Sequence, residues 1–126
     1  MSVQFNHTIV AAKDKALSAR FLTELLGLPE PKPAGHFLMV ELAHGVSLDY
    51  FQTDRDIAGQ HYAFLVSEDV FDALIAKIRE RGIPHWADPQ GRHPGEINTH
   101  DGGRGVYFQD PSGHYLEAIT RPYGGG

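Results

Sequence analysis

Residues 107–117 read YFQDPSGHYLE, and this stretch predicts two strands joined by a tight turn. Within the turn, residues 110–113, proline at the second position and glycine at the fourth are typical of a type I turn. The segments on either side, Gly105–Gln109 and Tyr115–Thr120, are the predicted strands. The stretch therefore predicts a strand–turn–strand unit whose last strand carries Glu117.

The residues before this unit complete a longer strand-and-helix pattern. Tyr62–Val66 is predicted as a strand, and Ser67 is a suitable N-cap for the helix that follows. Gly82 ends this helix. A long polar stretch, 88–103, then leads to the strands described above. The helix carries apolar residues on one side, at Val70, Phe71, Leu74, Ile75 and Ile78.

The first half of the chain shows the same order. A strand over Val3–Ala11 precedes a helix that Asp14 caps and Gly27 ends. Phe37–Leu42 and Val46–Phe51 are the predicted strands after it. The apolar stripe of this helix is formed by Leu17, Phe21, Leu22, Leu25 and Leu26.

The two halves can be aligned with each other. His7 aligns with His61 at a separation of 54 residues, and residues 45–49 (GVSLD) align with 113–117 (GHYLE) at a separation of 68. The polar stretch 88–103 accounts for the jump in offset. An internal repeat of this kind predicts a single domain over residues 1–126, with repeat 1 at about 1–55 and repeat 2 at about 58–123.

The composition narrows the class of protein. With 126 residues and 41% apolar side chains, the chain can form one small domain, and dimerisation would help to enlarge its core. A net charge of −5 argues against nucleic acid as a partner, and the apolar runs are too short for a membrane span. The N-terminus lacks a signal-peptide pattern, so a cytoplasmic location is expected. The glycine tail, 124–126, is expected to be disordered.

Four side chains that can bind a metal occupy matching places in the two repeats. Each repeat has a histidine in or directly before its first predicted strand, and a carboxylate in its last: His7 with Asp49, and His61 with Glu117. If the repeats pair about a pseudo-twofold axis, the four positions converge. The chain has no cysteine, so nitrogen and oxygen ligands must hold the ion, which suits Fe, Zn, Ni, Mn or Co.

Residues 6–9, 21–28, 61–64 and 107–117 resemble the vicinal oxygen chelate superfamily, which includes glyoxalase I, fosfomycin-resistance thiol transferases, bleomycin-binding proteins and extradiol dioxygenases. The resemblance implies an α+β fold of two βαβββ units, with a cup-shaped mixed sheet around a metal, and usually a homodimer. It also implies that His7, His61 and Glu117 are the metal ligands. Position 49 departs from the glyoxalase pattern, because Asp49 is one methylene shorter than the usual glutamate. Direct and water-mediated contact with the metal both remain open for Asp49.

The leading hypothesis is a metal-dependent enzyme whose metal, as a Lewis acid, chelates two neighbouring oxygens of a small substrate. Asp49 and Glu117 are the candidate catalytic carboxylates, with Asp49 as a candidate general base. Three alternatives stay open. They are an Fe(II) ring-cleaving dioxygenase, a thiol transferase acting on fosfomycin, and a non-catalytic binding protein of the bleomycin-resistance type.

The polar stretch 88–103 is a candidate binding loop, and a mobile solvated loop is the equally weighted alternative. Candidate substrate-binding residues in or beside this stretch are Arg92, His100 and Arg104. Arginine can bind a carboxylate or phosphonate through two hydrogen bonds. His114, three residues before Glu117, is expected to be structural, because the two side chains point to opposite faces of a strand. Candidate pocket residues, for which core packing is an equal explanation, are Tyr50, Phe51, Trp86, Tyr107 and Tyr115.

Overall fold

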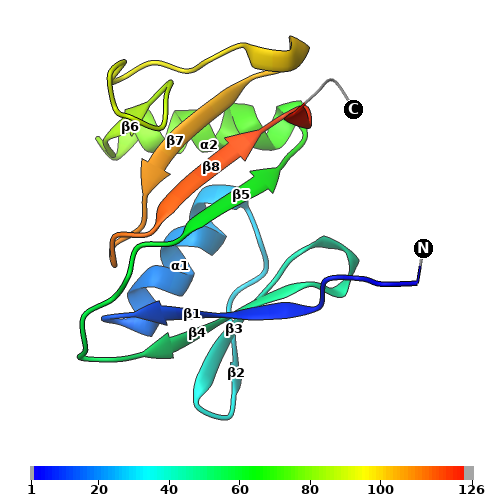
Figure 1. Cartoon of the computed structure of the whole chain (residues 1–126), viewed down its shortest axis with the longest axis vertical. Coiled ribbons are helices and arrows are strands. Elements are labelled where there is room, and N and C mark those ends of the chain that lie inside the picture. Colours follow the sequence, from blue (N-terminus) through cyan, green and yellow to red (C-terminus); the bar gives the residue numbers. More distant parts are fainter. Residues whose placement is uncertain (1, 124–126) are drawn as a thin grey trace. The chain divides into compact units, whose positions relative to one another are not determined.

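The computed structural model describes residues 2–123, and the glycine tail expected to be disordered lies outside this range. The chain divides into two compact units, which we call module 1 (Met1–Ile57) and module 2 (Ala58–Gly126). Each module contains one helix and a four-stranded sheet (Figure 1). No helix within residues 2–123 combines the length and the apolar character needed to cross a bilayer.

Module 1 has the order strand, helix, strand, strand, strand. Its sheet has the strand order β1-β4-β3-β2, in which β1 runs parallel to β4 and the other pairs are antiparallel. A short 3-10 turn, η1 (Ala43–Gly45), joins the last two strands. The main elements are β1 (His7–Ala12), α1 (Lys15–Leu26), β2 (Lys32–Ala34), β3 (Phe37–Glu41) and β4 (Ser47–Gln52).

Module 2 repeats this topology. Its sheet has the strand order β5-β8-β7-β6, with β5 parallel to β8 and the other pairs antiparallel. The predicted α+β fold of two βαβββ units with mixed sheets is therefore confirmed. The elements are β5 (His61–Leu65), α2 (Glu68–Glu80), β6 (His85–Trp86), η2 (His100–Gly102), β7 (Gly105–Gln109) and β8 (Tyr115–Ile119).

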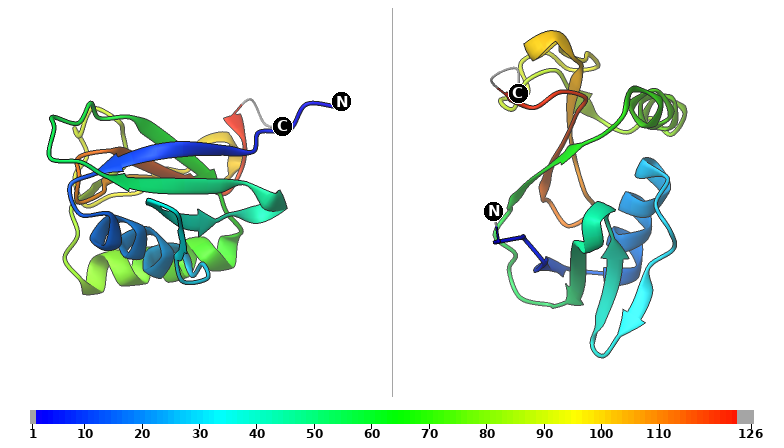
Figure 2. Two further views of the ribbon diagram at one scale, coloured as in Figure 1. Left: turned by 90° about the horizontal axis from the view of Figure 1, so that it is seen from below. Right: turned by 90° about the vertical axis from the view of Figure 1, so that its right-hand side faces the viewer.

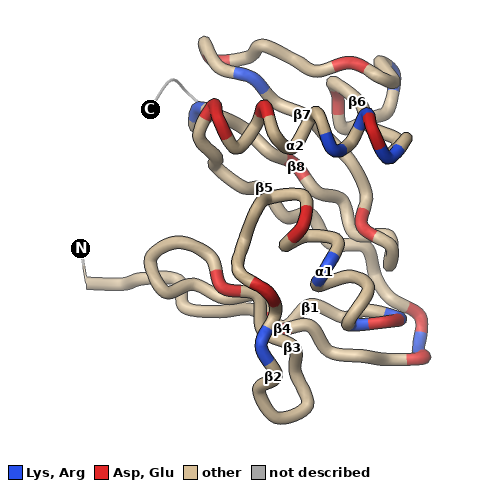
Figure 3. The backbone as a smooth tube through the Cα atoms, turned by 180° about the vertical axis from the view of Figure 1, so that it is seen from behind, with Lys and Arg blue, Asp and Glu red and all other residues tan. Residues whose placement is uncertain are grey.

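Both helices begin where the sequence predicts. The Asp14 carboxylate accepts a hydrogen bond from the backbone N–H of Leu17 at 3.1 Å, and the Ser67 hydroxyl accepts one from Val70 at 3.2 Å. Helix α2 also has acidic residues in its first turn and basic residues in its last (Figure 3). This distribution opposes the helix dipole at both ends and stabilises the helix.

One face of each sheet carries the apolar core. In module 1 the alternation of β1 and β4 directs Val10, Leu48 and Tyr50 to the side of α1, where all three are buried. Figure 2 shows α1 along this side of the strands. In module 2, Phe108 and Leu116 are buried in the same way. The histidines and carboxylates of interest therefore belong to the opposite face of each sheet.

The structure differs from the sequence-based expectation at three places. Strand β1 begins at His7 rather than Val3. Two short edge strands, β2 and β6, were not predicted. Strand β2 contains Pro33, which has no N–H to donate and so is tolerated only at a sheet edge. Strands of two or three residues carry almost no periodic signal, because pairing with a neighbouring strand defines them.

Candidate functional site

His61 and Glu117 lie together on the face of the module 2 sheet away from the core. In the parallel pairing of β5 and β8, His61 is opposite Tyr115 and Ala63 is opposite Glu117, so the two side chains share one face. The distance from His61 Nε2 to Glu117 Oε1 is 3.0 Å. The Glu117 side chain is only 1% exposed, whereas that of His61 is 52% exposed. A buried carboxylate thus faces an accessible imidazole.

The second ring nitrogen of His61 orients the imidazole. Nδ1 lies 3.2 Å from the carbonyl oxygen of Tyr115. An Nδ1–H that donates to this carbonyl leaves Nε2 with a lone pair directed at Glu117. Two acceptors 3.0 Å apart repel each other unless a proton or a cation lies between them. His61 Nε2 and Glu117 Oε1 can therefore both offer a lone pair to a divalent cation bound between them.

Two tyrosines cover Glu117 on this otherwise open face. Tyr107 is its partner on the neighbouring strand, and the Tyr107 ring is stacked against His61 with 6.4 Å between ring centroids. The Tyr123 hydroxyl donates a hydrogen bond to Glu117 Oε2, and it lies 3.4 Å from the Tyr107 hydroxyl. Burial raises the pKa of both phenols, and hydrogen bonding to Glu117 raises it further. Both tyrosines are therefore protonated donors at neutral pH.

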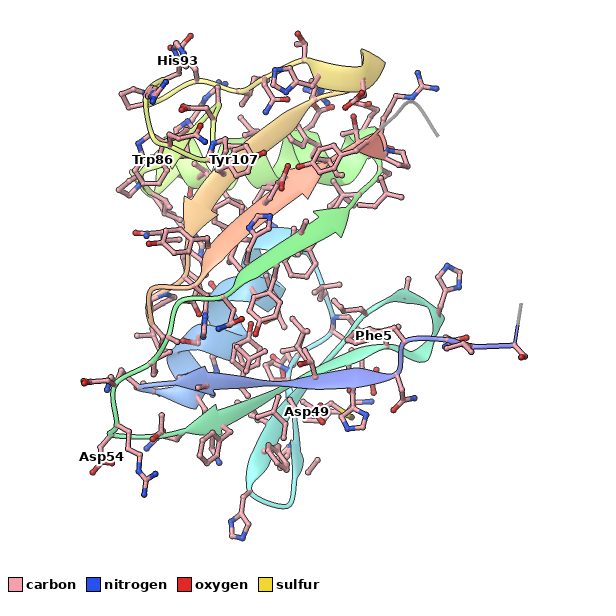
Figure 4. The ribbon with its side chains drawn as sticks, in the orientation of Figure 1. Phe5, Asp49, Asp54, Trp86, His93 and Tyr107 are labelled. Carbon is pink, nitrogen blue, oxygen red and sulfur yellow. The ribbon has the colours of Figure 1, made fainter. Side chains whose placement is uncertain are left out.

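Module 1 holds a matching pair in the same strand register. His7 is opposite Ser47 and Ile9 is opposite Asp49, as His61 is opposite Tyr115 and Ala63 is opposite Glu117. The Ser47 hydroxyl donates to Asp49 Oδ1 at 2.9 Å. Asp49, labelled in Figure 4, is half-buried rather than fully buried. Sequence alignment of the two halves thus predicted a real structural equivalence.

Each module contributes one histidine and one carboxylate to the candidate ligand set. Among the described residues, 2–123, no three His, Asp or Glu side chains form a group that could hold a metal ion. Module 2 brings His61 and Glu117 into contact, and module 1 places His7 and Asp49 on one sheet face. The imidazole and carboxylate groups present fit Fe, Zn, Ni, Mn or Co, which accept nitrogen and oxygen ligands.

A cavity of about 530 Å³ in module 2 opens beside His61. Trp86 and Tyr107, which pair across β6 and β7, lie side by side on its wall (Figure 4). Of the candidate pocket aromatics, Tyr50 is instead a buried core residue of module 1. The full lining comprises His61, Trp86, Asp88, Pro89, Gln90, Gly91, Tyr107, Phe108, Gln109, Tyr115 and Leu116. The cavity lining therefore combines four aromatic side chains, Trp86, Tyr107, Phe108 and Tyr115, with a few polar groups, as small-molecule sites often do.

Residues 88–91 line this cavity, and the backbone of residues 88–93 is hydrogen-bonded to the Asp88 side chain. The Asp88 carboxylate accepts hydrogen bonds from the backbone N–H groups of Arg92 (2.9 Å) and His93 (2.8 Å). Desolvation opposes ionisation of Asp88, but these two donors prevail and lower its pKa. Gly91, with φ +72°, passes close to the indole of Trp86. These backbone contacts with Asp88 were invisible in the sequence, because they depend on the path of the loop.

None of the three candidate substrate-binding residues is part of the cavity lining. The Arg104 guanidinium contacts Glu68 at 2.8 Å and Asp72 at 2.7 Å, and its Cζ lies 4.6 Å from the centre of the Phe71 ring. Hydrogen bonds to these carboxylates raise the pKa of Arg104. Arg92 and His100 are exposed. In this structure Arg104 therefore binds helix α2.

His114 is a structural residue, as predicted. It is only 1% exposed, and its Nδ1 accepts a hydrogen bond from the backbone N–H of Gln60 at 3.0 Å. Its own backbone N–H donates to Asp110 at 2.8 Å. Tyr123, in contrast, was missed by sequence reasoning. The sequence shows only an aromatic residue six positions after Glu117. This spacing predicts no contact until the segment after β8 is placed beside the sheet.

Comparison with known proteins shows what the chain is similar to. The model of the Glyoxalase/Bleomycin resistance protein/Dioxygenase superfamily matches residues 4–118. The solved structure named oxidase ChaP-H1 is 57% identical, with a TM-score of 0.96, covering 98% of this chain and 100% of that one. Oxidase ChaP-H2 is 61% identical, with a TM-score of 0.96 and 100% coverage of both chains.

A more distant relative is the glutathione transferase FosA of Serratia marcescens. It is 29% identical over 125 residues, which cover 93% of this chain and 80% of FosA. The family match extends through both modules and includes the strands that carry His7, His61 and Glu117. The chain therefore belongs to the Glyoxalase/Bleomycin resistance protein/Dioxygenase superfamily.

Proposed function

We propose that the protein is a divalent-metal-dependent enzyme of the oxidase type that acts on a small molecule bound through two neighbouring oxygens. The observation that carries this proposal is the pair formed by His61 and buried Glu117, 3.0 Å apart beside a cavity of about 530 Å³. The names of ChaP-H1 and ChaP-H2, at 57% and 61% identity, support oxidative chemistry.

In this proposal His7, His61 and Glu117 are the protein ligands of the metal. A divalent ion held by these residues would act as a Lewis acid toward the substrate oxygens. Tyr115 orients the His61 ring through its carbonyl, and Tyr107 adds a phenolic donor beside the same site. The flat aromatic wall formed by Trp86 and Tyr107 suits a planar substrate.

Asp49 is assigned a supporting role as a general base or a water-mediated ligand. Its Oδ1 atom accepts the Ser47 hydroxyl at 2.9 Å, which holds the carboxylate on the same sheet face as His7. The side chain is half-buried, so a water molecule can reach it. We expect Asp49→Asn to retain the metal and to lose turnover, and full turnover of this variant contradicts the role.

An Fe(II) ring-cleaving dioxygenase is the second candidate. Two histidines and one carboxylate with open positions are the ligand set of non-haem Fe(II) oxygenases, and the aromatic cavity suits an aromatic diol. Oxygen consumption with catechol-type diols, measured on the Fe(II)-loaded protein, distinguishes this activity. A fosfomycin thiol transferase, the remaining enzyme candidate, would instead consume a thiol without oxygen, and the relative FosA is named a glutathione transferase.

Metal titration of the full chain tests the proposal. The purified protein, freed of metal by chelator, is titrated with Fe(II) under anaerobic conditions and with Co(II). We expect about one ion per chain, and we expect His61→Ala and Glu117→Gln to weaken binding by at least 100-fold. His36→Ala, which changes an exposed histidine of module 1, is the matched control.

Absence of stoichiometric metal binding by the wild-type chain would contradict the enzyme proposal and favour a non-catalytic binding protein.

Light scattering on the metal-loaded chain measures its oligomeric state. The mass expected for the homodimer is twice the 13.9 kDa of one chain.

A further inference from the structure

Tyr123 follows β8 in the sequence, and its hydroxyl contacts a side chain of the module 2 sheet. The residue as a whole is 61% exposed, yet its hydroxyl donates to Oε2 of Glu117, a side chain that is 1% exposed. The other carboxylate oxygen, Oε1, faces His61 Nε2 at 3.0 Å. The two oxygens of Glu117 therefore have separate partners on separate sides.

We propose that Tyr123 is a positioning residue that reserves Oε2 of Glu117, so that Glu117 binds the metal through Oε1 alone. This inference rests on the proposed function, since it assumes a metal at His61 and Glu117. A hydrogen bond from a phenol to a carboxylate oxygen is charge-assisted, and it competes with coordination of that oxygen to a cation. A carboxylate restricted to one metal contact leaves a further coordination position for substrate.

The geometry also explains how the Glu117 side chain is kept in one conformation. Glutamate has several rotatable bonds, and holding it in one rotamer costs conformational entropy. Tyr107 covers the side chain from β7, and the Tyr107 hydroxyl lies 3.4 Å from that of Tyr123. The two phenols thus hold the carboxylate before the metal arrives, as outer partners of metal ligands commonly do.

A purely structural role for Tyr123 is the competing explanation. The residue is 61% exposed, so it adds little to the core, but its hydroxyl provides a hydrogen bond to a buried carboxylate. That role predicts a change in thermal stability and no change in metal coordination. Metal affinity and the metal's spectrum therefore separate the two explanations.

The test uses Tyr123→Phe in the full chain, titrated with Co(II) and followed by visible absorption. We expect Co(II) to bind about tenfold more weakly, because Glu117 loses the phenol that holds its carboxylate in place. We also expect a changed ligand-field spectrum, because Oε2 becomes free to coordinate. Tyr62→Phe is the matched control. It removes a phenol of module 2 whose ring contacts His114 in an edge arrangement, with ring centroids 5.6 Å apart, on the other face of β5.

The outcomes are distinguishable. If the wild type binds Co(II) and Tyr123→Phe binds it with the same affinity and spectrum, the proposed role of Tyr123 is overturned and the proposed function is not. An equal effect of Tyr62→Phe overturns it as well, because the change is then not specific to Glu117. Failure of the wild type to bind Co(II) overturns the proposed function and this inference together. Circular dichroism at 25 °C checks that both variants are folded.

Discussion

At the scale of single residues, the two modules treat equivalent carboxylates differently. Asp49 and Glu117 occupy the same register position, but their cross-strand partners are Met39 and Tyr107. Glu117 is covered by aromatic rings and receives a phenolic hydrogen bond, whereas Asp49 receives the hydroxyl of Ser47. The duplication therefore supplies one buried carboxylate and one that solvent can reach, which suits a division of roles between ligand and base.

Arg104→Ala tests whether this arginine serves the fold or the substrate. We expect the free energy of unfolding to fall by about 1 kcal/mol, because the variant loses two surface ion pairs and a contact with the Phe71 ring. Chemical denaturation measures this change, and metal affinity should stay the same. Arg92→Ala, which changes an exposed loop residue, should be neutral. Weaker substrate binding by Arg104→Ala without loss of stability would instead restore its assignment to the substrate site.

At the scale of elements, the two modules share the same kind of helix C-terminus, which is a glycine in a left-handed conformation. Gly27 follows α1 with φ +66°, and Gly82 follows α2 with φ +64°. The two glycines are aligned in the sequence repeat at a separation of 55 residues. Both ends need a left-handed conformation that other residues adopt only with strain, so the sequence signal and the backbone geometry have one cause.

Gly27→Ala and Gly82→Ala should therefore destabilise the protein to a similar extent, by about 1 kcal/mol each. Neither position has a heavy atom within 4 Å of an added Cβ, so the expected loss comes from backbone strain alone. Thermal unfolding of the two variants and their double mutant measures it. Wild-type stability in either variant would show that the helix end relaxes to a different conformation.

The loop at residues 88–93 makes stability depend on pH. The backbone donors of Arg92 and His93 lower the pKa of Asp88 in the folded state. A lowered folded-state pKa contributes stability above the unfolded value, near 4, and this contribution is lost as pH falls through the folded-state pKa. We expect Asp88→Asn to lower Tm at pH 7 and to differ little from the wild type at pH 2.

Thermal unfolding between pH 7 and pH 2 checks this prediction. Asp56→Asn, at an exposed position of module 1, is the control and should follow the wild type throughout. A Tm difference between Asp88→Asn and the wild type that is constant with pH would mean that the Asp88 charge is not responsible.

At the scale of the whole molecule, binding of the proposed metal is coupled to folding. A ligand that binds only the folded chain stabilises it in proportion to the logarithm of its concentration, by about 2.7 kcal/mol at 100 times Kd. For a chain of 126 residues this corresponds to a rise in Tm of roughly 10 °C. Thermal unfolding with and without Co(II) measures the shift, and excess chelator should reverse it. The same shift in His61→Ala would place the stabilising ion elsewhere.

Much of the architecture follows from local signals in the sequence. The helix caps at Asp14 and Ser67, the turn at residues 110–113 and the apolar stripes of both helices involve residues within about one turn of each other. Such local signals do not depend on how distant parts of the chain are folded. The alignment of His7 with His61 added a long-range prediction, since the second copy of a unit must repeat the register of the first.

By itself, then, the sequence determined the duplicated order of strand, helix, strand and strand, the helix ends and the strands of the two candidate carboxylates, but not the edge strands β2 and β6. Only the tertiary structure decided that Tyr107 and Tyr123 cover Glu117, that Arg104 binds α2, and that Asp88 fixes the cavity wall. The physical reason is that periodicity and capping act between near neighbours in sequence. Burial and hydrogen bonding across a sheet depend instead on which distant segments the fold brings together.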